Sequence, residues 1–437
     1  MYTKGSIYLK KTEKRGICMA LMKPFKAIRP KEELSDRIAA LPYDVYNREE
    51  AKKEVKREPL SFLRIDRAET LLEDTVDTYD ASVYQKAHDE LWCMVRNGSF
   101  IQDAEACYYI YELEMNGRAQ TGIVACASVD DYLNGVIMKH ENTREDKELD
   151  RIRHVSACEA QTGPIFLTYE ANRNIDRLVE QVKKAQAPIY EFEAIDGVIH
   201  KAWKIDQKDK IDLLSQEFQK INQIYIADGH HRCASAVKVA LKQRELDKNQ
   251  GIDGKEKKES DYFLSVIFPH NQLKILDYNR VIKDLNGYTR ETILKELSKW
   301  FILVEKGKNP FKPSKRREFG MYLEDTWYAL RLREAYEELD VVQGLDVSIL
   351  QNLVLNPLFG IKDPKTDKRI DFIGGIRGLT ELEDRVHRDC KIAFAMYPTS
   401  IEELIAVANE HKLMPPKSTW FEPKLRSGLF IHDIRKK

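Results

Sequence analysis

The sequence predicts an α+β fold with mixed sheets, and three observations lead to that expectation. Residues 81–96 place apolar side chains at the four-residue steps of a helix, whereas residues 108–115 and 121–129 are strand-like and flank an Asn-Gly pair typical of a hairpin turn. Helical and strand-like segments are interspersed through the rest of the chain. At 437 residues the chain exceeds the usual size of a single hydrophobic core, so two or three packed units with clefts between them are expected.

The expected elements can be followed in order from residue 34 to residue 241. A helical pattern over 34–57 is interrupted at 41–45, because the proline at position 42 disfavours helix in the residue before it. The helix over 81–96 ends at an Asn-Gly pair, which favours termination. Beyond the hairpin, the patterns predict a helix over 145–160, a strand over 164–169, a helix over 208–221, a strand over 223–227 and a helix over 232–241.

Shifts in composition suggest four portions of chain. The first 21 residues are basic and lack the apolar core of an export signal, so a disordered leader is expected there, with an upstream translation start as the alternative. Residues near 245–260 are rich in Lys, Glu, Asp and Gly without apolar periodicity, so an exposed insertion is expected there. The expected portions are 1–21 (leader), 22–206 (N-terminal α+β), 207–287 (phosphate-loop unit with the insertion) and 288–437 (C-terminal α/β).

The composition is that of a folded globular protein and disfavours several functional classes. Lysine plus arginine and aspartate plus glutamate each number 71, so no net charge draws the protein to nucleic acid. The seven cysteines are scattered and form no C-x-x-C pair, which argues against a disulfide framework or a zinc ribbon. No run approaches the roughly 18 apolar residues of a membrane span. We therefore expect a cytoplasmic protein without membrane or nucleic-acid partners.

The strongest candidate for chemistry is the Ala-Asp-Gly-His-His-Arg segment that begins at residue 227, between a strand and a helix. Gly229 allows backbone to approach a ligand, and the N–H groups of a first helical turn attract an anion. Arg232 can bind a phosphate through two hydrogen bonds, and His230 and His231 can donate to it. Asp228 can hold a metal ion or accept a proton. The alternative is a capped helix whose histidines are solvated surface groups.

A second candidate is the His-Glu-Asn-Thr segment that begins at His140. His140 and Glu141 directly follow a strand, where open sheets present functional side chains, and both are catalytic candidates. Thr143, Asp150 and Arg151 follow and are candidates for substrate binding or support. The alternative is that Thr143 caps the next helix, with the acidic residue three positions later as its capping-box partner.

Two weaker segments complete the candidate site. Lys417, Ser418 and Thr419 are a lysine and two hydroxyls, as at the end of a phosphate loop, but the glycines of that motif are missing. An exposed charged loop is the alternative, although the Trp-Phe pair that follows suggests an anchored segment. Tyr43 and Asp44 lie in the loop that interrupts the first helical pattern, where a turn with a buried tyrosine is the alternative to a substrate contact.

Four ordered motifs together resemble a known family. They are similar to those of the prokaryotic domain-of-unknown-function family numbered 1015, from about Lys23 to His432, and this resemblance implies no particular reaction. The motifs are Pro42–Val45, His140–Thr143 with Asp150–Arg151, Ala227–Arg232 and Pro415–Phe421.

The Asp-Gly-His-His-Arg loop also resembles the phosphate loop of the ParB and sulfiredoxin superfamily, over residues 223–241 only. The resemblance implies an embedded ParB/sulfiredoxin-like nucleotide-binding unit. In the free serine kinases of that superfamily such a loop binds nucleotide phosphates and its aspartate takes part in phosphoryl transfer. Those roles would fall to Asp228, Gly229, His230 and Arg232. Sulfiredoxin has its reactive cysteine, and ParB a glutamate, where this chain has His230, so the resemblance implies neither of those chemistries.

These residues favour a nucleotide-dependent kinase of a small hydroxyl compound. ATP or ADP is the expected nucleotide, and Mg²⁺ held by Asp228 is the expected ion. Glu141 is the candidate base on grounds of its chemistry, and Lys417 is expected to close over the phosphates. Free L-serine is the acceptor that the resemblance implies. A non-enzymatic nucleotide-binding regulator is the alternative, because binding a phosphate and transferring it use the same donors.

Overall fold

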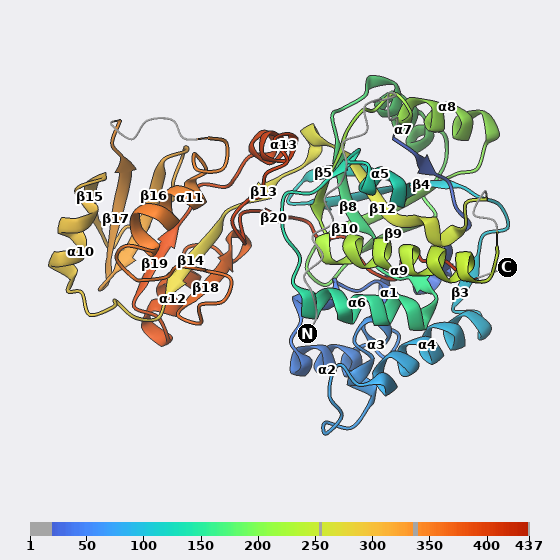
Figure 1. Cartoon of the computed structure of the whole chain (residues 1–437), viewed down its shortest axis with the longest axis horizontal. Helices are drawn as coiled ribbons and strands as arrows, with labels where there is room; N and C mark the ends of the chain where they lie inside the picture. The colour runs from blue at the N-terminus through green and yellow to red at the C-terminus, as the bar shows by residue number, and fades with distance from the viewer. Residues whose placement is uncertain (1–19, 253–255, 335–339, 436–437) are drawn as a thin grey trace.

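The computed structural model describes residues 20–252, 256–334 and 340–435, which form a larger and a smaller lobe (Figure 1). Both lobes combine helices with sheets, so the expected α+β class with mixed sheets is confirmed. The leader expected over 1–21 lies outside the described residues except for its last two positions. Ala20 is buried, and its N–H donates to the Ile221 carbonyl at 3.2 Å.

The larger lobe is built around a nine-stranded mixed sheet. Its strand order is β6-β11-β8-β12-β5-β4-β10-β9, with β1 paired to β5; β11 runs parallel to β6, and β12 runs parallel to β8. The strands are β1 (Met22–Lys23), β4 (Tyr108–Met115), β5 (Arg118–Ser128), β6 (Ile137–Met138), β8 (Ile165–Tyr169), β9 (Tyr190–Glu193), β10 (Ile199–Ile205), β11 (Ile224–Asp228) and β12 (Tyr262–Pro269).

The expected hairpin is present between β4 and β5. Asn116 and Gly117 both have positive φ, 54° and 73°, as the two central residues of a type I′ turn require. Successive residues of β4 then point to opposite faces of the sheet: Tyr108 packs into one buried cluster and Tyr109 into another. Both faces of this sheet are therefore covered.

Helices cover one face of the large sheet and also form a separate layer of their own. Side chains of α5, α7, α8 and α9 share a buried cluster with one face, whereas α2, α3 and α4 pack with β3 in another cluster (Figure 1). These helices are α1 (Ser35–Ile38), α2 (Arg48–Arg57), α3 (Leu63–Asp66), α4 (Ala81–Arg96), α5 (Val129–Leu133), α6 (Glu145–Cys158), α7 (Arg173–Ala185), α8 (Lys208–Phe218) and α9 (His230–Asn249); β3 is Phe100–Gln102.

The smaller lobe holds a six-stranded sheet of order β15-β17-β16-β19-β14-β18. All of its strand pairs are antiparallel. Its strands are β14 (Tyr278–Ile282), β15 (Phe301–Gly307), β16 (Glu318–Leu323), β17 (Thr326–Leu332), β18 (Ile370–Gly374) and β19 (Ile392–Ala395). Its helices are α10 (Arg290–Leu297), α11 (Asp346–Leu350), the π-helix η6 (Gln351–Leu355), α12 (Thr380–Arg388) and α13 (Ile401–Asn409).

The C-terminal segment leaves the smaller lobe and returns to the larger one. Phe430 and its neighbours pack on the face of the large sheet that carries Tyr109, with ring centroids of these two residues 5.0 Å apart. The portion expected over 288–437 thus contributes to both lobes, and the portions 22–206 and 207–287 share one sheet. The short pairs are β13 (Ile275–Leu276) with β20 (Trp420–Phe421), β7 (Ala160–Gln161) with β21 (His432–Asp433), and β2 (Ile28–Pro30) with β3.

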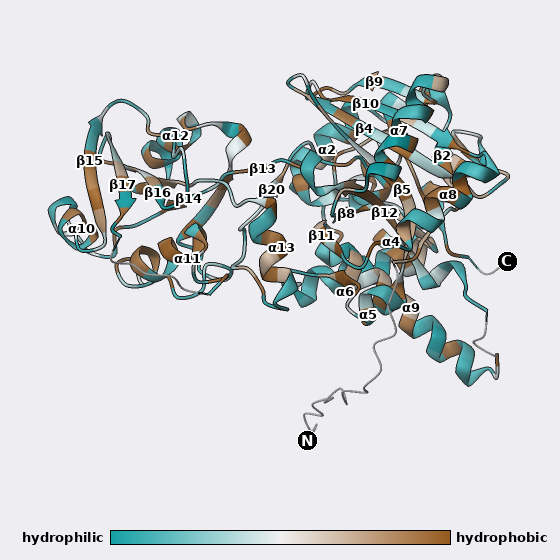
Figure 2. Ribbon diagram, turned by 90° about the horizontal axis from the view of Figure 1, so that it is seen from above, coloured by the Kyte–Doolittle hydropathy of each residue, from teal (hydrophilic) through white to brown (hydrophobic). Residues whose placement is uncertain are grey.

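Helix α9 is longer at both ends than the sequence pattern indicated. The pattern suggested 232–241, but the helix begins at His230 and continues to Asn249, into the stretch expected to be an exposed insertion. Its distal turns project from the larger lobe and are mostly hydrophilic (Figure 2). Asp247 is nevertheless buried, and residues 253–255 lie outside the described residues. Charged side chains on an exposed helical face removed the periodicity on which the prediction depended.

Two global features concern the helices and the cysteines. Within the described ranges, none of the helices has both the length and the apolar character needed to cross a membrane. The six cysteines that the structure describes are all free.

Candidate functional site

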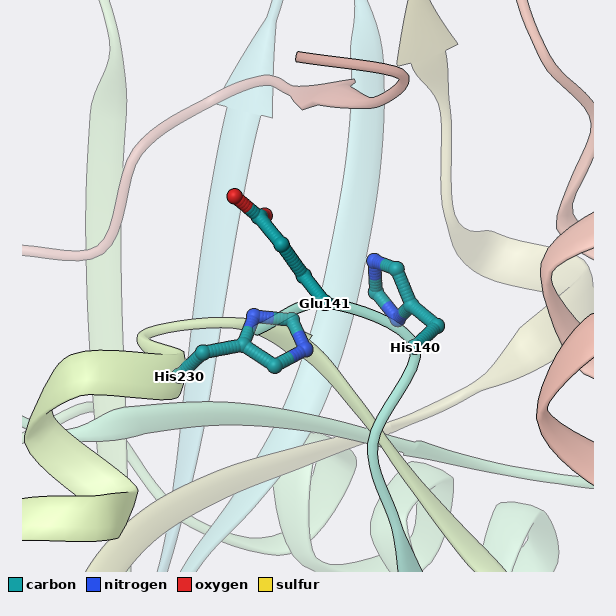
Figure 3. A group of neighbouring side chains, drawn as sticks. All are labelled: His140, Glu141 and His230. Atoms are coloured by element: carbon teal, nitrogen blue, oxygen red, sulfur yellow. The ribbon is translucent and has the colours of Figure 1, made fainter. Parts of the chain in front are cut away.

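The two polar loops singled out in the sequence meet because their strands are parallel neighbours. Ile224 pairs with Ile137 and Tyr225 pairs with Met138, so β6 and β11 end at the same edge of the sheet. His140 follows β6 by two residues, and His230 follows β11 by two residues. The two imidazole rings lie edge to face with their centroids 4.5 Å apart (Figure 3).

Gly229 shapes the turn between β11 and α9. Its φ of 89° lies in the left-handed region that other residues rarely adopt. A Cβ at this position would also lie 3.2 Å from Nε of Arg232, so the missing side chain leaves space for the guanidinium. Among the described residues no side chain caps the N-terminus of α9, so the first-turn N–H groups have no capping acceptor there. The loop therefore has the form expected of an anion site.

Asp228 is held as a carboxylate. Its Oδ1 accepts from the Gly229 N–H at 2.8 Å, and its Oδ2 lies 3.0 Å from Nζ of Lys424. Burial alone would raise its pKa, but Lys424 and Arg232 outweigh burial and leave the pKa well below the usual value. The anion suits charge stabilisation or metal binding and makes Asp228 a poor proton acceptor. Lys424, 196 residues away in the sequence, was not among the expected site residues.

His140 and His230 are buried beside Asp228. Burial lowers the pKa of His140 to about 4, although the Asp228 charge and the Ile226 backbone act in the opposite direction. Burial also lowers the pKa of His230 well below its usual value. Both rings are therefore neutral at pH 7. Apart from the Ile226 backbone near His140, the described residues offer no hydrogen-bond partner to the buried ring nitrogens of His140 or to the buried Nε2 of His230.

Glu141 projects from the same loop toward the cleft between the lobes. Burial raises the pKa of its carboxyl group; Lys417 acts against this shift, and Asp228 adds to it. A carboxyl with a raised pKa is suited to proton transfer near neutral pH. Lys417 and Lys365 come from the C-terminal half and line the cleft with it. Within the described ranges neither lysine forms an ion pair, and Lys417 Nζ lies 5.5 Å from the Tyr278 ring centroid.

The cleft has a volume of about 610 Å³, within the range of small-molecule sites. It is formed by the N-terminal loops, the segment after β6, the start of α9 and two stretches of the C-terminal half. Asp228, His230 and Arg232 are not on its wall; Arg232 lines a neighbouring cavity of about 30 Å³. Among the expected site residues, the lining ones are Tyr43, Asp44, Glu141, Asp150, Arg151, His231 and Lys417.

Arg232 lies between that smaller cavity and the Gly229 turn. One of its terminal nitrogens, Nη1, donates to the Pro164 carbonyl at 2.6 Å. The guanidinium also lowers the pKa of Asp228, as described above. Arg232 is neither part of a surface ion pair nor packed in the core. The remaining N–H groups of its guanidinium are therefore available to an anion that enters at the Gly229 turn.

His231 is placed differently from the expectation that it donates to a phosphate. Its Nε2 accepts a hydrogen bond from the Arg144 N–H at 3.0 Å, so in this state only Nδ1 carries a proton. The expected capping box is also absent: Arg144 is the N-cap residue of α6 and caps with no side chain. The Thr143 hydroxyl instead donates to Glu148 at 2.7 Å, and Asp146 pairs with Arg144.

Asp150 and Arg151 form a paired, buried cluster at the wall of the cleft. Arg151 Nε donates to Asp150 at 2.8 Å, and the Tyr84 hydroxyl donates to the same carboxylate at 3.0 Å. The guanidinium lies over the Tyr43 ring, 4.0 Å from its centroid. Burial alone would lower the pKa of Arg151, but Asp150 and Tyr43 raise it, so Arg151 remains charged. Tyr43 is buried in a 3₁₀ turn, as the alternative interpretation expected.

The hydroxyls after Lys417 are engaged within their own segment. The Ser418 hydroxyl donates to the Pro415 carbonyl at 2.6 Å, and the Ser418 carbonyl accepts from Thr399. Thr419 directly precedes β20, and neither hydroxyl residue lines the cleft. The anchoring suggested by the Trp-Phe pair is present, because β20 pairs with β13. Of Lys417, Ser418 and Thr419, only Lys417 lines the cleft.

Comparison with known proteins gives a family and several remote structures. A family model described as "Protein of unknown function (DUF1015)" matches residues 22–348. No curated protein matches. A conserved hypothetical protein from Pyrococcus furiosus is 12% identical with a TM-score of 0.34, over 71% of this chain and 94% of the other. A free serine kinase variant in complex with AMP is 13% identical with a TM-score of 0.34, over 71% and 91%. C-terminally truncated SbnI from Staphylococcus aureus is 12% identical with a TM-score of 0.35, over 71% and 87%. Likenesses at this level carry no argument about chemistry.

Proposed function

We propose that this chain, which belongs to the DUF1015 family of unknown function, is a nucleotide-dependent kinase of a small hydroxyl compound. ATP or ADP is the proposed donor, and free L-serine is the first acceptor to test. The observation that carries the proposal is the convergence of Glu141, His231 and Lys417, from three distant stretches of chain, on one cleft beside an uncapped helix N-terminus.

The phosphate groups are proposed to bind between the Gly229 turn and the C-terminal half. The first-turn N–H groups of α9 and the guanidinium of Arg232 supply donors for one end of the phosphate chain. Lys417 and Lys365 supply positive charge from the C-terminal half, and neither forms a direct ion pair within the described residues. Phosphoryl transfer depends chiefly on such positioning and charge neutralisation.

Asp228 is proposed to hold Mg²⁺. The ion commonly binds one or two carboxylates together with substrate phosphates. Asp228 is a carboxylate at the phosphate loop, and its oxygens keep lone pairs beyond their bonds to Gly229 and Lys424, so it fits this role. Mg²⁺ would supply charge neutralisation on the phosphates. Lys424 contacts the same carboxylate and is a further cation at this end of the site.

The acceptor is proposed to lie in the cleft against Glu141. This carboxylate lines the cleft near Lys417, so it can accept the proton of a hydroxyl placed beside the phosphate chain. Asp44 lies on the wall of the same cleft and is exposed, which suits contact with an amino group of an acceptor such as serine. Tyr43, Asp150 and Arg151 would shape the wall rather than react.

The proposal is tested by incubating purified protein with ATP or ADP, Mg²⁺ and a panel of hydroxyl metabolites that includes L-serine. Phosphorus NMR should show a new phosphomonoester that depends on both nucleotide and acceptor. Calorimetry on the same protein reports nucleotide binding separately. Tight nucleotide binding without product from any acceptor would favour a nucleotide-responsive regulator. Absence of nucleotide binding would overturn both the kinase and the regulator interpretation.

A further inference from the structure

Three potential metal ligands meet at the ends of β6 and β11 (Figure 3). The ligand atoms of His140, Glu141 and His230 all lie within 4.8 Å of one another. In a tetrahedral site with bonds of about 2.0–2.1 Å, neighbouring ligand atoms are about 3.3 Å apart. Each atom would move by about 1 Å or less to bind one ion, which small side-chain rotations can supply.

The two histidines differ from the other buried histidines of the protein. His140 is 1% exposed and His230 is 7% exposed, and within the described ranges the ring nitrogens named above have no hydrogen-bond partner apart from the Ile226 backbone near His140. A buried polar atom without a partner lowers the stability of the folded state, so such atoms call for an explanation. The other buried histidines in the described ranges all have partners: His154 contacts Ile65, His200 contacts Tyr111, and His432 contacts Gln161 and Glu259.

Both rings stand on firmly placed backbone. His140 follows a strand of the large sheet, and its carbonyl accepts from the Met414 N–H at 2.8 Å. His230 is the first residue of a 20-residue helix that begins directly after β11. Ligands on such elements keep their geometry better than ligands on free loops. The fold therefore fixes the positions of both rings.

The ligand types select a class of ion. Two neutral imidazoles and one carboxylate suit Zn²⁺, Fe²⁺, Mn²⁺ or Co²⁺, whereas Mg²⁺ prefers oxygen ligands and retained waters. We propose that His140, His230 and Glu141 form a binding site for one divalent first-row transition-metal ion. The three side chains leave at least one coordination position for water or a ligand. Because Glu141 lines the cleft, that position is near the space proposed for substrates.

This site is distinct from the proposed magnesium site. It would add a second metal ion to the proposed kinase, but metal binding itself does not require kinase activity. Asp228 faces Lys424 and Gly229, whereas the new site uses the histidines and the neighbouring glutamate. A carboxylate bound through one oxygen keeps the second oxygen available, so metal binding is compatible with a contact between Glu141 and an acceptor. Metal binding can be measured without nucleotide, so failure of one proposal is distinguishable from failure of the other.

The test uses full-length protein that has been treated with a chelator and freed of it. Zn²⁺ alone is titrated by calorimetry, and Co²⁺ alone is titrated by visible absorption, where the bands report coordination number. One ion per chain is expected. Glu141→Gln and His230→Ala should each weaken binding by at least about tenfold, a loss found even for residues that only support ligands. Mg²⁺ in excess should not displace Co²⁺.

His411→Asn is the matched control for binding at surface histidines. His411 is exposed, and asparagine tolerates its positive φ of 53°. The His411→Asn variant should bind Zn²⁺ with the same affinity as the parent protein. If a histidine variant fails to fold, Glu141→Gln still tests the site, because it keeps the shape of a half-buried side chain.

Three results would overturn the assignment. The first is absence of stoichiometric Zn²⁺ or Co²⁺ binding, and the second is parental affinity in both Glu141→Gln and His230→Ala. The third is displacement of Co²⁺ by Mg²⁺, which would remove the assigned ion class. A defect in nucleotide binding or product formation would bear on the kinase proposal alone.

Discussion

Two buried polar clusters lie close to the cleft, and they differ in how completely their atoms are paired. Asp150 and Arg151 line the cleft, whereas His140 and His230 do not. Around Arg151, the guanidinium, the Asp150 carboxylate and the Tyr84 hydroxyl are joined by hydrogen bonds, and the Tyr43 ring covers the cation. Around His140 and His230, buried ring nitrogens find no hydrogen-bond partner in the described part of the chain apart from the Ile226 backbone. Both clusters are equally inaccessible to solvent, so burial does not explain the contrast.

The difference separates a structural role from a ligand-binding one. A paired buried cluster has no capacity for another polar group, and its loss exposes the remaining charge to an apolar environment. An unpaired cluster retains donors and acceptors that a water molecule, an ion or a ligand can satisfy. We therefore expect substitutions near Arg151 to lower stability, and substitutions at the Gly229 turn to alter binding and turnover.

The largest expected effect is on stability. Asp150→Ala leaves the buried Arg151 without its carboxylate, which should lower the free energy of unfolding by about 3–5 kcal/mol. Urea unfolding followed by fluorescence measures the change. Asp150→Asn, which can still accept from Tyr84, should lose less. A loss below about 1 kcal/mol for Asp150→Ala would show that the cluster is not the paired structural unit described here.

The next effect concerns Arg232, which lines the small cavity next to Tyr43 and Arg151 but is bound to a single carbonyl. Arg232→Ala should weaken nucleotide binding by about 2 kcal/mol or more, as for loss of a charge-assisted hydrogen bond, with a smaller change in stability. Calorimetry measures the affinity. Arg333→Ala is the matched control, since Arg333 also donates to one carbonyl, that of Ser298, and should bind nucleotide as the parent does. Unchanged nucleotide affinity in Arg232→Ala would show that Arg232 has a structural role and does not bind phosphate.

A smaller effect is expected on the pH dependence of stability, through a histidine next to the Arg151 cluster. Burial lowers the pKa of His154, and Arg151 adds to this shift, while Asp66 and Asp150 oppose it; Cys158 also borders the ring. The unfolded chain therefore binds a proton near pH 6.5 that the folded protein does not, so stability should fall as pH drops below about 6.5.

His154→Gln should make that decline shallower, by up to about 1.4 kcal/mol per pH unit. Glutamine can keep the contact with the Ile65 carbonyl. Urea unfolding between pH 5 and 7 measures the slope. The same slope in parent and variant would mean that His154 does not contribute to the pH dependence.

The smallest effect is expected at the surface. Asp146 pairs with Arg144 in an ion pair whose side chains are 50% and 51% exposed. Asp146→Asn should change the free energy of unfolding by less than about 1 kcal/mol, because solvent and salt screen such pairs. It is thus the matched control for Asp150→Ala. If Asp146→Asn lowered the free energy of unfolding as much as Asp150→Ala does, the exposed and the buried ion pairs would not differ in their contribution to stability.

Local features of the fold and the site could be predicted from the sequence. The Asn-Gly hairpin and the strand, glycine and helix around Gly229 depend on residues adjacent in the chain. The length of α9 could not be predicted, because its distal turns carry charge around an exposed surface and lack periodicity.

Contacts between distant segments could not be predicted. Lys424 reaches Asp228 only because the C-terminal segment returns to the larger lobe, and no local pattern encodes that return. The pairing of His140 with His230 requires β6 and β11 to be parallel neighbours, which neither strand indicates alone. The protonation state of His231 likewise depends on the distant Arg144 N–H.

Turnover by Asp228→Asn at saturating nucleotide tests the proposed phosphoryl transfer most directly. Phosphorus NMR follows product formation, calorimetry gives the affinity of the same sample, and unfolding confirms that the variant is folded without the Lys424 ion pair. If Asp228 acts on the reacting phosphate, turnover should fall by about 100-fold or more while nucleotide affinity stays within about tenfold of the parent. Turnover at the parental level, or a loss confined to affinity, would contradict the account.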